Sequence, residues 1–372
     1  MKTVNGHEVI ELFEKWSPKR YALEGDPVGL HIGQLNRTVK KVLVTLDVNE
    51  AVIDEAIDVG ANLIIAHHPP IFRPLKNIAT DTPQGQVIEK CIKNDIAVYA
   101  AHTNLDVAPG GVNDLLAARL GLKKTKVMSP TYSEALYKFV VFSPATHAEE
   151  IRKAMASSGA GAIGEYEGCS FTMSGTGRFT PVGQANPYIG EVGLEEEVDE
   201  VKIEAIVPEK LRDKVLRSIL KAHPYEEPAY DIFQLDQQTN NLGLGRVGEL
   251  DEQVRLGQFV DRVKKAFNVP VVRFVGNPSK VIKKVAVLGG DGNKYIHDAK
   301  RSGADVFVTG DLYYHVAHDA EAIGLSIVDP GHNIEKVMIE GVVDYMTAAC
   351  LEQKIAVTFI KSEIKTEPFQ FR

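Results

Sequence analysis

The sequence predicts an α/β protein in which two pseudo-repeated α/β halves form one core, interrupted by a ferredoxin-like α+β insert domain. Three observations lead to this prediction. Residues 28–68 resemble residues 271–311 without a gap, strand-like and helix-like segments alternate in both regions, and the middle of the chain breaks this alternation. We therefore place the first half of the core at residues 1–130, the insert at 131–240 and the second half at 241–372.

The evidence for the repeat is a set of short segments of similar residue type that recur in both regions at a constant separation in the sequence. Lys40–Val44 falls on Lys283–Val287, and Gly60–Ile65 falls on Gly303–Val308. Each copy has a β-rich run, a helical stretch that ends at glycine and a second β-branched run, as expected for a covered parallel sheet. Any two strand–helix–strand units share this outline, but a match without gaps favours a repeat.

Both halves continue with alternating elements. The expected helices are 6–16, 82–94, 111–120, 254–267, 313–323 and 333–353, and the expected strands are 42–46, 62–66, 97–101, 304–308, 325–328 and 355–360. In the insert the expected order is strand 137–142, helix 148–157, strand 169–173, strand 201–207, helix 209–222 and strand 229–233, which is the ferredoxin-like arrangement. The polar, glycine-containing segment 237–245 is expected to be a linker.

Composition and charge limit the functional classes. The chain has 372 residues and a formal net charge of 42 − 50 = −8, which disfavours nonspecific nucleic-acid binding because that needs clustered Lys and Arg. No apolar run approaches the roughly 20 residues of a membrane span, and the N-terminus lacks the apolar stretch of a signal peptide, so we expect a cytoplasmic protein. The cysteines, Cys91, Cys169 and Cys350, are far apart and are expected to be reduced and buried.

Histidines and carboxylates follow the expected strands of both halves. The residues at or just past these strand ends are His67, His68, His102, Asp106, Asp311, His315, His332 and Glu335. Because ligands collect at the carboxyl ends of the strands in α/β sheets, we expect such side chains to share one edge. Imidazole together with carboxylate suits Zn, Fe, Mn, Co or Ni. The sequence therefore predicts a metal site.

The spacing of these residues is compatible with one centre. His332 and Glu335 are three apart and would share a face of a helix. His67 and His68 would point to opposite sides of a regular strand, but this constraint relaxes at a strand end that is followed by proline. Two clusters that converge from two halves favour a pair of ions bridged by a carboxylate, and Asp106 is the expected bridge.

Other readings of these residues stay open. The histidines are alternatively helix caps or partners of loop carbonyls, although their concentration on one edge favours ligands. Asp47, Glu24 and Asp26 are either cap and turn residues or acceptors for metal-bound imidazoles. Gly289–Gly292 is either a tight strand-to-helix turn or a phosphate cradle, and His223–Pro228 is either a helix-to-strand turn or a binding segment.

Four motifs together resemble one known family. AHHPP at 66–70, AHTNLD at 101–106, TGD at 309–311 and GHNIE at 331–335 resemble the Nif-three-like family, whose members are also called GTP cyclohydrolase I type 2 homologues. The resemblance covers essentially the full chain. It implies two divalent metal ions per subunit, with zinc the first choice and Fe, Mn, Co or Ni as alternatives. The ligands that it implies are His67, His68, Asp106, His332 and Glu335.

The resemblance has further implications and one departure. It implies a toroidal homohexamer and an insert similar to CutA and to nitrogen-regulatory signalling proteins. Many members carry the His and Glu of the last motif four apart, whereas His332 and Glu335 are three apart here. Both spacings keep one helical face, so Glu335 stays the expected ligand. Lys336 takes the four-apart position and cannot ligate while it is protonated.

Two functions compete at this point. The resemblance implies a metal-dependent hydrolase that acts on GTP or a related nucleotide, with water activated by the ions. His102 and His315 would then move protons, and Asp47 and Asp311 would orient the ligand histidines. The alternative is a metal-dependent regulatory or sensing scaffold without turnover, in which the metal is structural or sensed and the insert gates access to a ring cavity. Nucleic acid is not an expected partner, because the sequence offers only isolated basic pairs.

Overall fold

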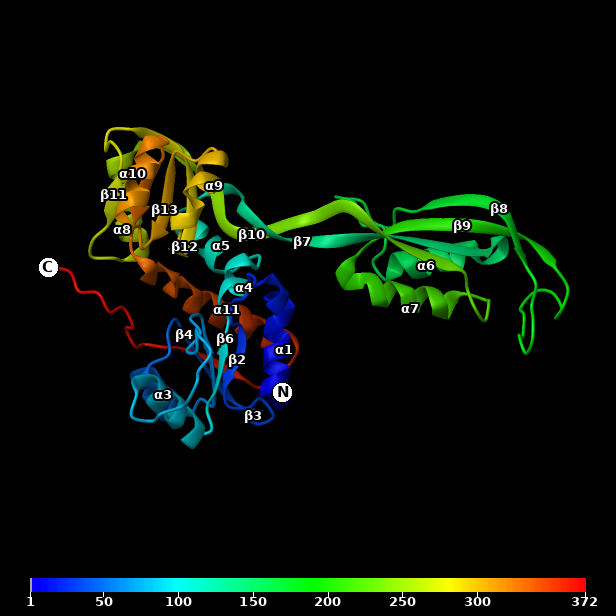
Figure 1. The fold of residues 1–372 in the computed structure, drawn as a ribbon, viewed down its shortest axis with the longest axis horizontal. Helices are drawn as coiled ribbons and strands as arrows, with labels where there is room; N and C mark the ends of the chain where they lie inside the picture. Colours follow the sequence, from blue (N-terminus) through cyan, green and yellow to red (C-terminus); the bar gives the residue numbers. More distant parts are fainter. Residues whose placement is uncertain (1) are drawn as a thin grey trace. The chain divides into compact units, whose positions relative to one another are not determined.

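The computed structural model describes residues 2–372, except for the side chains of residues 238–240. The fold is mixed α/β, as expected. The chain divides into two compact units (Figure 1). Unit 1 joins the residues up to Tyr132 with Leu242–Arg372, and unit 2 is Ser133–Asn241. No helix in residues 2–372 is both long and apolar enough to cross a membrane.

A five-stranded sheet in unit 1 is built from the first part of the chain and its last strand. Its order is β15 (Thr358–Lys361), β4 (Lys41–Thr45), β5 (Leu63–Ala66), β6 (Ala97–Ala100) and β2 (Gly29–Ile32). The strands β15, β4, β5 and β6 are parallel, and β2 is antiparallel to β6. Every residue of β5 is buried, as is typical of a strand covered on both faces.

Local sequence signals explain where the helices of this half begin and end. The helices are α1 (Gly6–Trp16), α2 (Glu50–Val59), α3 (Pro83–Lys93), α4 (Thr103–Val107) and α5 (Val112–Arg119). Helix α1 has the expected bounds because Asn5 and Glu8 form a capping box. Helix α2 begins after the cap Asn49 and ends at Gly60, whose φ of 70° suits glycine. Helix α4 was not expected.

A second group of strands comes from the later part of the chain. Within unit 1 its order is β11 (Arg273–Val275), β14 (Ser326–Asp329), β13 (Val306–Gly310), β12 (Val281–Asp291) and the end of β10 (Tyr230–Arg255). The strands β12, β13 and β14 are parallel, whereas β10 and β11 pair antiparallel with β12 and β14. The helices of this half are α8 (Leu256–Phe267), α9 (Ile296–Arg301), α10 (Tyr314–Ala322) and α11 (Val337–Glu352).

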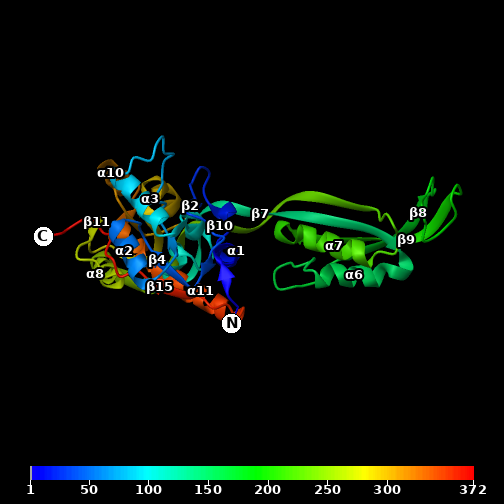
Figure 2. The same ribbon diagram turned by 90° about the horizontal axis from the view of Figure 1, so that it is seen from below.

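One hydrophobic core joins the two sheets of unit 1. It contains side chains of β4 and β5, such as Val44 and Ile65, together with Val287 of β12 and Val308 of β13. Helix α11 lies against β15 and β4 and begins directly after the turn that follows β14, so it ties the two sheets together (Figures 1 and 2). This shared core holds the carboxyl ends of both sets of parallel strands in place.

Unit 2 has the element order strand, helix, strand, strand, helix, strand. These elements are β7 (Lys123–Pro144), α6 (Ala148–Ser157), β8 (Phe171–Phe179), β9 (Glu196–Pro208), α7 (Arg212–Ala222) and the first part of β10, with β10, β7, β9 and β8 as neighbours in that order. Helices α6 and α7 pack together on one face of the strands (Figure 2). His223 follows α7, and its Nε2 lies 2.8 Å from the Phe142 carbonyl.

Two segments differ in secondary structure from what was expected. The segment 237–245 does connect the two units, which divide between Asn241 and Leu242, but it does so as part of the continuous strand β10 (Tyr230–Arg255) rather than as an irregular linker. A strand held by main-chain hydrogen bonds tolerates polar side chains, so its composition misled the prediction. The expected helix 333–353 begins instead as a 3₁₀-helix, η5 (His332–Lys336), and turns into α11 only at Val337.

Candidate metal centre

The expected ligands lie where strands of both sheets end. His67 and His68 directly follow β5, and their backbone amides donate to the carbonyls of Thr45 and Leu46, at 3.1 and 2.9 Å. These bonds fix a bend after the strand, which lets two adjacent imidazoles reach one place. Asp106 lies in α4, just after β6. The last two ligands follow β14.

His332 and Glu335 share a face because they lie in the 3₁₀-helix η5. In a 3₁₀-helix, side chains three apart are eclipsed, so the three-residue spacing is the one that brings them together. Their atoms Nε2 and Oε2 are 3.0 Å apart. The departure from a four-residue spacing therefore follows from the tighter helix, and it leaves Lys336 exposed.

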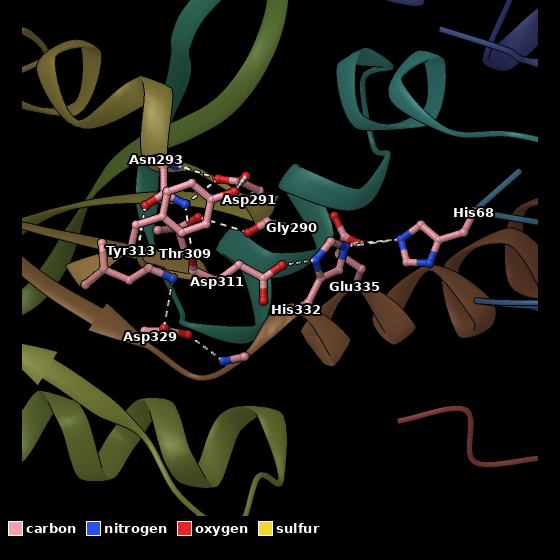
Figure 3. Close-up of polar contacts among 12 residues, drawn as sticks. His68, Gly290, Asp291, Asn293, Thr309, Asp311, Tyr313, Asp329, His332 and Glu335 are labelled. Carbon is pink, nitrogen blue, oxygen red and sulfur yellow. Dashed lines mark hydrogen bonds and ion pairs between the residues drawn. The ribbon is translucent and has the colours of Figure 1, made fainter. Parts of the chain in front are cut away.

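One trio of ligand atoms spans the two halves of unit 1 (Figure 3). His68 Nε2 lies 3.2 Å from His332 Nε2 and 3.1 Å from Glu335 Oε2. Bonds of about 2.0 Å to a tetrahedral metal imply ligand atoms about 3.3 Å apart. The trio therefore already has the dimensions of one face of a zinc-like coordination sphere.

A second trio is more deeply buried and shares one carboxylate with the first. His67 Nε2 lies 3.7 Å from Glu335 Oε2 and 3.8 Å from Asp106 Oδ1. His67 is fully buried, and Asp106 and Glu335 are 7% and 3% exposed. His67 Nε2 and Asp106 Oδ1 have no hydrogen-bond partner. Each such buried polar atom costs about 1–3 kcal/mol, which a cation between them would offset.

The Nδ1 atom of each clustered histidine has its own partner. Three of these partners are carboxylates: Asp47 lies 2.6 Å from His68, Asp26 lies 2.7 Å from His102, and Asp311 lies 2.7 Å from His332. The fourth is the Ala101 carbonyl, 2.8 Å from His67. With Nδ1–H donated to these acceptors, a neutral ring presents the Nε2 lone pair to the cluster, as metal-ligating histidines do.

This orientation makes the cluster fit a metal. In their neutral forms, His68 and His332 direct two Nε2 lone pairs at each other across 3.2 Å and at the carboxylate of Glu335. Such an arrangement is repulsive unless a proton or a metal cation lies between the atoms. Neutral imidazole and carboxylate are ligands of Zn and of other transition metals.

The side chains of the cluster shift one another's pKa values in the absence of a metal. Burial alone would lower the pKa of His68, but hydrogen bonds to Asp47 and Glu335 outweigh it and raise the pKa to about 9. The hydrogen bond to Glu335 raises the pKa of His332 to about 10. Burial raises the pKa of Asp106 to about 6. For Glu335, burial acts in the same direction, but the neighbouring imidazoles hold its pKa well below the usual value.

Metal affinity is therefore expected to rise with pH. His68 and His332 hold protons up to pH values near 9 and 10, and a metal must displace them. Each released proton makes the apparent affinity rise roughly tenfold per pH unit below that pKa. Zinc competition with a chromophoric chelator at pH 6, 7 and 8 measures this rise. An affinity that stays constant over this range contradicts the assignment of these two ligands.

Two of the four auxiliary candidates contact the ligands. Asp47 and Asp311 accept from the Nδ1 atoms of His68 and His332. His102 forms a further group of potential ligands with His67 and His68. His315 does not join the cluster: it lies exposed on α10, and its ring contacts Tyr314, with centroids 5.4 Å apart. Its position one turn into that helix takes it away from the strand ends.

The glycine run at the end of β12 makes a contribution to the site that the sequence did not indicate. A Cβ atom on Gly289 or Gly290 would come within 2.8 Å of Glu335 Oε1. Both glycines belong to the strand itself, which runs to Asp291. The run therefore makes room for the shared carboxylate. Glu24, another candidate, is exposed.

A network of hydrogen bonds at the ends of β13 and β14 holds the segments that carry Asp311 and His332 (Figure 3). The sequence did not indicate most of this network. Asp329 is 3% exposed; its Oδ2 accepts from the Leu312 amide at 3.1 Å and from Arg273, and its Oδ1 accepts from the Gly331 amide at 2.9 Å. Asn293 donates to the Asp311 carbonyl at 2.8 Å, which helps hold Asp311 at a φ of 52°.

The fold and this cluster define a mixed α/β protein with a buried histidine–carboxylate site of the metal-binding type. The family described as Duf34/NIF3 (NGG1p interacting factor 3) matches residues 4–368. The chain belongs to this family, which confirms the resemblance seen in its motifs.

Individual relatives are similar to this chain over its whole length. A Bacillus subtilis (strain 168) protein called GTP cyclohydrolase 1 type 2 homolog is 56% identical over 370 residues, covering 100% of this chain and 99% of the relative. The solved structure of a Bacillus cereus protein related to NIF3 has a TM-score of 0.94 at 56% identity, with full coverage of both chains. A Staphylococcus aureus protein, SA1388, has a TM-score of 0.83 at 34% identity, again with full coverage.

Proposed function

We propose that the cluster binds two divalent metal ions that share the carboxylate of Glu335. One position would use His68, His332 and Glu335, and the other His67, Asp106 and Glu335. The observation that carries this proposal is the membership of Glu335 in both trios, through Oε2 in each measured contact. The sequence had suggested Asp106 as the bridge, but Asp106 joins only one trio. Zinc suits the first trio best, with Fe, Mn, Co and Ni as alternatives.

The reaction that we propose for this centre is hydrolysis of GTP or a related nucleotide. When bound, two such ions supply Lewis acidity and lower the pKa of water. The name of the Bacillus subtilis relative, GTP cyclohydrolase 1 type 2 homolog, supports the choice of GTP as the first substrate to test.

His102 is the residue that we propose to move protons during the reaction. Its Nδ1 is held by Asp26 at 2.7 Å, and its ring lies 5.3 Å from that of His67 between centroids. The Asp26 carboxylate accepts from Nδ1–H and so leaves Nε2 to accept a proton and return it. His315, the other candidate, is too far removed from the cluster to share this role.

Turnover of GTP by His67→Ala and His68→Ala proteins tests the proposed reaction. We expect GTP hydrolysis to fall at least about 100-fold in each variant, because each loses a ligand. His315→Ala is the matched control, since it removes an exposed histidine outside the cluster. Product formation by chromatography measures the effect. Turnover that persists after complete metal removal contradicts a metal-dependent hydrolase and leaves the sensing scaffold as the better explanation.

We also propose that the protein assembles as a ring-shaped homohexamer, as the motif resemblance implies. Light scattering coupled to size-exclusion chromatography gives the mass, which we expect to be about six times the 40.8 kDa of one chain. A monomeric mass at micromolar concentration contradicts this assembly.

A further inference from the structure

A cavity of about 870 Å³ lies beside the candidate metal centre. Asp311 and His332 line it, so one end reaches the first trio of ligands. Ligand pockets in proteins typically measure about 300–1,000 Å³. The cavity is therefore large enough for a small molecule that contacts the centre, and all of its lining residues belong to unit 1.

Apolar side chains from distant parts of the sequence line part of this cavity, among them Val271 and Ile339. The C-terminal segment 361–371 forms a further wall, which is mostly polar and charged but adds Phe369 and Phe371. Phe369 and Phe371 are 68% and 52% exposed, and neither ring stacks on another aromatic ring within the described part of the chain. Exposed aromatic rings in a cavity offer a surface on which a planar ligand ring can stack.

Residues 362–366 of the C-terminal wall are held by contacts with the rest of unit 1. Ser362 and Thr366 donate through their hydroxyl groups to Glu55 and Asp47, and Ile364 packs against the core beneath them. These inward residues alternate, as in an extended chain. Asp47 also accepts from His68 Nδ1 at 2.6 Å. This part of the wall is therefore tied through the Asp47 carboxylate to a ligand of the centre.

One unpaired cation in the cavity points to an anionic group on the ligand. Lys336 lines the cavity directly after the shared ligand Glu335 and forms no ion pair in the described structure. Arg273 lines the cavity too, and only its Nη2 is engaged, with Asp329 and Leu312. Five carboxylates and four Lys and Arg side chains line the cavity, so its overall charge does not favour an anion, and the anionic group is assigned to the unpaired Lys336.

We propose that this cavity is the ligand-binding site of the centre. It would take an anion that carries a planar ring, with Lys336 binding the anionic group and Phe369 and Phe371 contacting the ring. This inference rests on the proposed function, because the anion would also face the metal ions. It goes further in assigning ligand selection to Lys336 and to a C-terminal segment that supplies no metal ligand.

Three probes separate the two parts of the proposed site: GMP carries both ring and anion, guanosine lacks the anion, and inorganic phosphate lacks the ring. Their Kd values are measured by calorimetry, and by ligand-observed NMR where binding is weak, on metal-loaded protein. We expect Lys336→Gln to raise the Kd of GMP and phosphate about tenfold and to leave guanosine unchanged. We expect the double variant Phe369→Ala/Phe371→Ala to raise the Kd of GMP and guanosine about tenfold and to leave phosphate unchanged.

Lys283→Ala is the control, because Lys283 is exposed and lies outside the cavity. Metal content and unfolding midpoint, measured on every variant, separate a lost contact from a damaged centre or fold. If the metal-loaded wild type binds no GMP, or if both variants bind it as Lys283→Ala does, this inference is wrong while the metal centre stands. A wild type that binds no metal overturns the proposed function and this inference together.

Discussion

Replacing Glu335 by Gln is expected to empty both metal positions of the centre. Its Oε2 lies 3.0 Å from His332 Nε2, 3.1 Å from His68 Nε2 and 3.7 Å from His67 Nε2. Gln has a similar shape but lacks the charge that balances two dications. We expect the affinity for both ions to fall by more than about 100-fold, measured as metal per chain after dialysis.

Two further variants make this prediction specific. Glu352→Gln changes an exposed carboxylate at the end of α11 and should leave both ions bound. Asp106→Asn should remove only the ion held with His67, because Asp106 belongs to one trio and not to the other. Equal metal content in the Glu335→Gln and Glu352→Gln proteins would show that the shared carboxylate is not a ligand.

Replacing Asp329 by Ala is expected to give the second large effect, on stability. The buried carboxylate accepts from the amides of Leu312 and Gly331 and from Arg273. Three lost hydrogen bonds, one of them to the buried Leu312 amide, amount to about 3 kcal/mol of unfolding free energy. Because Leu312 follows Asp311 and Gly331 precedes His332, we also expect weaker metal binding.

Urea unfolding followed by the fluorescence of Trp16 measures this loss, since Trp16 is the only tryptophan and lies in unit 1. Asp319→Ala is the control, because Asp319 is an exposed carboxylate on α10 with no side-chain partner in the described structure. If the two variants unfold at the same urea concentration, Asp329 does not hold the two strand ends together.

The candidate ligands could be predicted because each lies at or shortly after the end of a buried strand. A run such as Leu63–Ala66 is recognisable from its composition alone, and the end of a parallel strand has a known place in an α/β sheet. His67, His68, Asp106, His332 and Glu335 therefore needed no knowledge of side-chain contacts. These residues come together only because one core joins the two halves of unit 1. The motif resemblance implied this convergence, whereas composition did not.

Other features lacked a local signal. The turn that brings His332 and Glu335 together is a 3₁₀-helix, and short 3₁₀ and α segments look alike in sequence. Whether Glu335 or Asp106 belongs to both trios depends on how their side chains lie in three dimensions. Thr366 acts on Asp47 from 319 residues away. No pattern of spacing reveals a contact of that kind.

Crystals of the zinc-loaded protein, with anomalous diffraction recorded on both sides of the zinc absorption edge, test the central claim most directly. We predict two anomalous peaks per chain on either side of Glu335, one near His68 and His332 and one near His67 and Asp106. A map with no peak within about 3 Å of Glu335 Oε2, where a zinc ligand bond of about 2 Å requires one, would contradict the account.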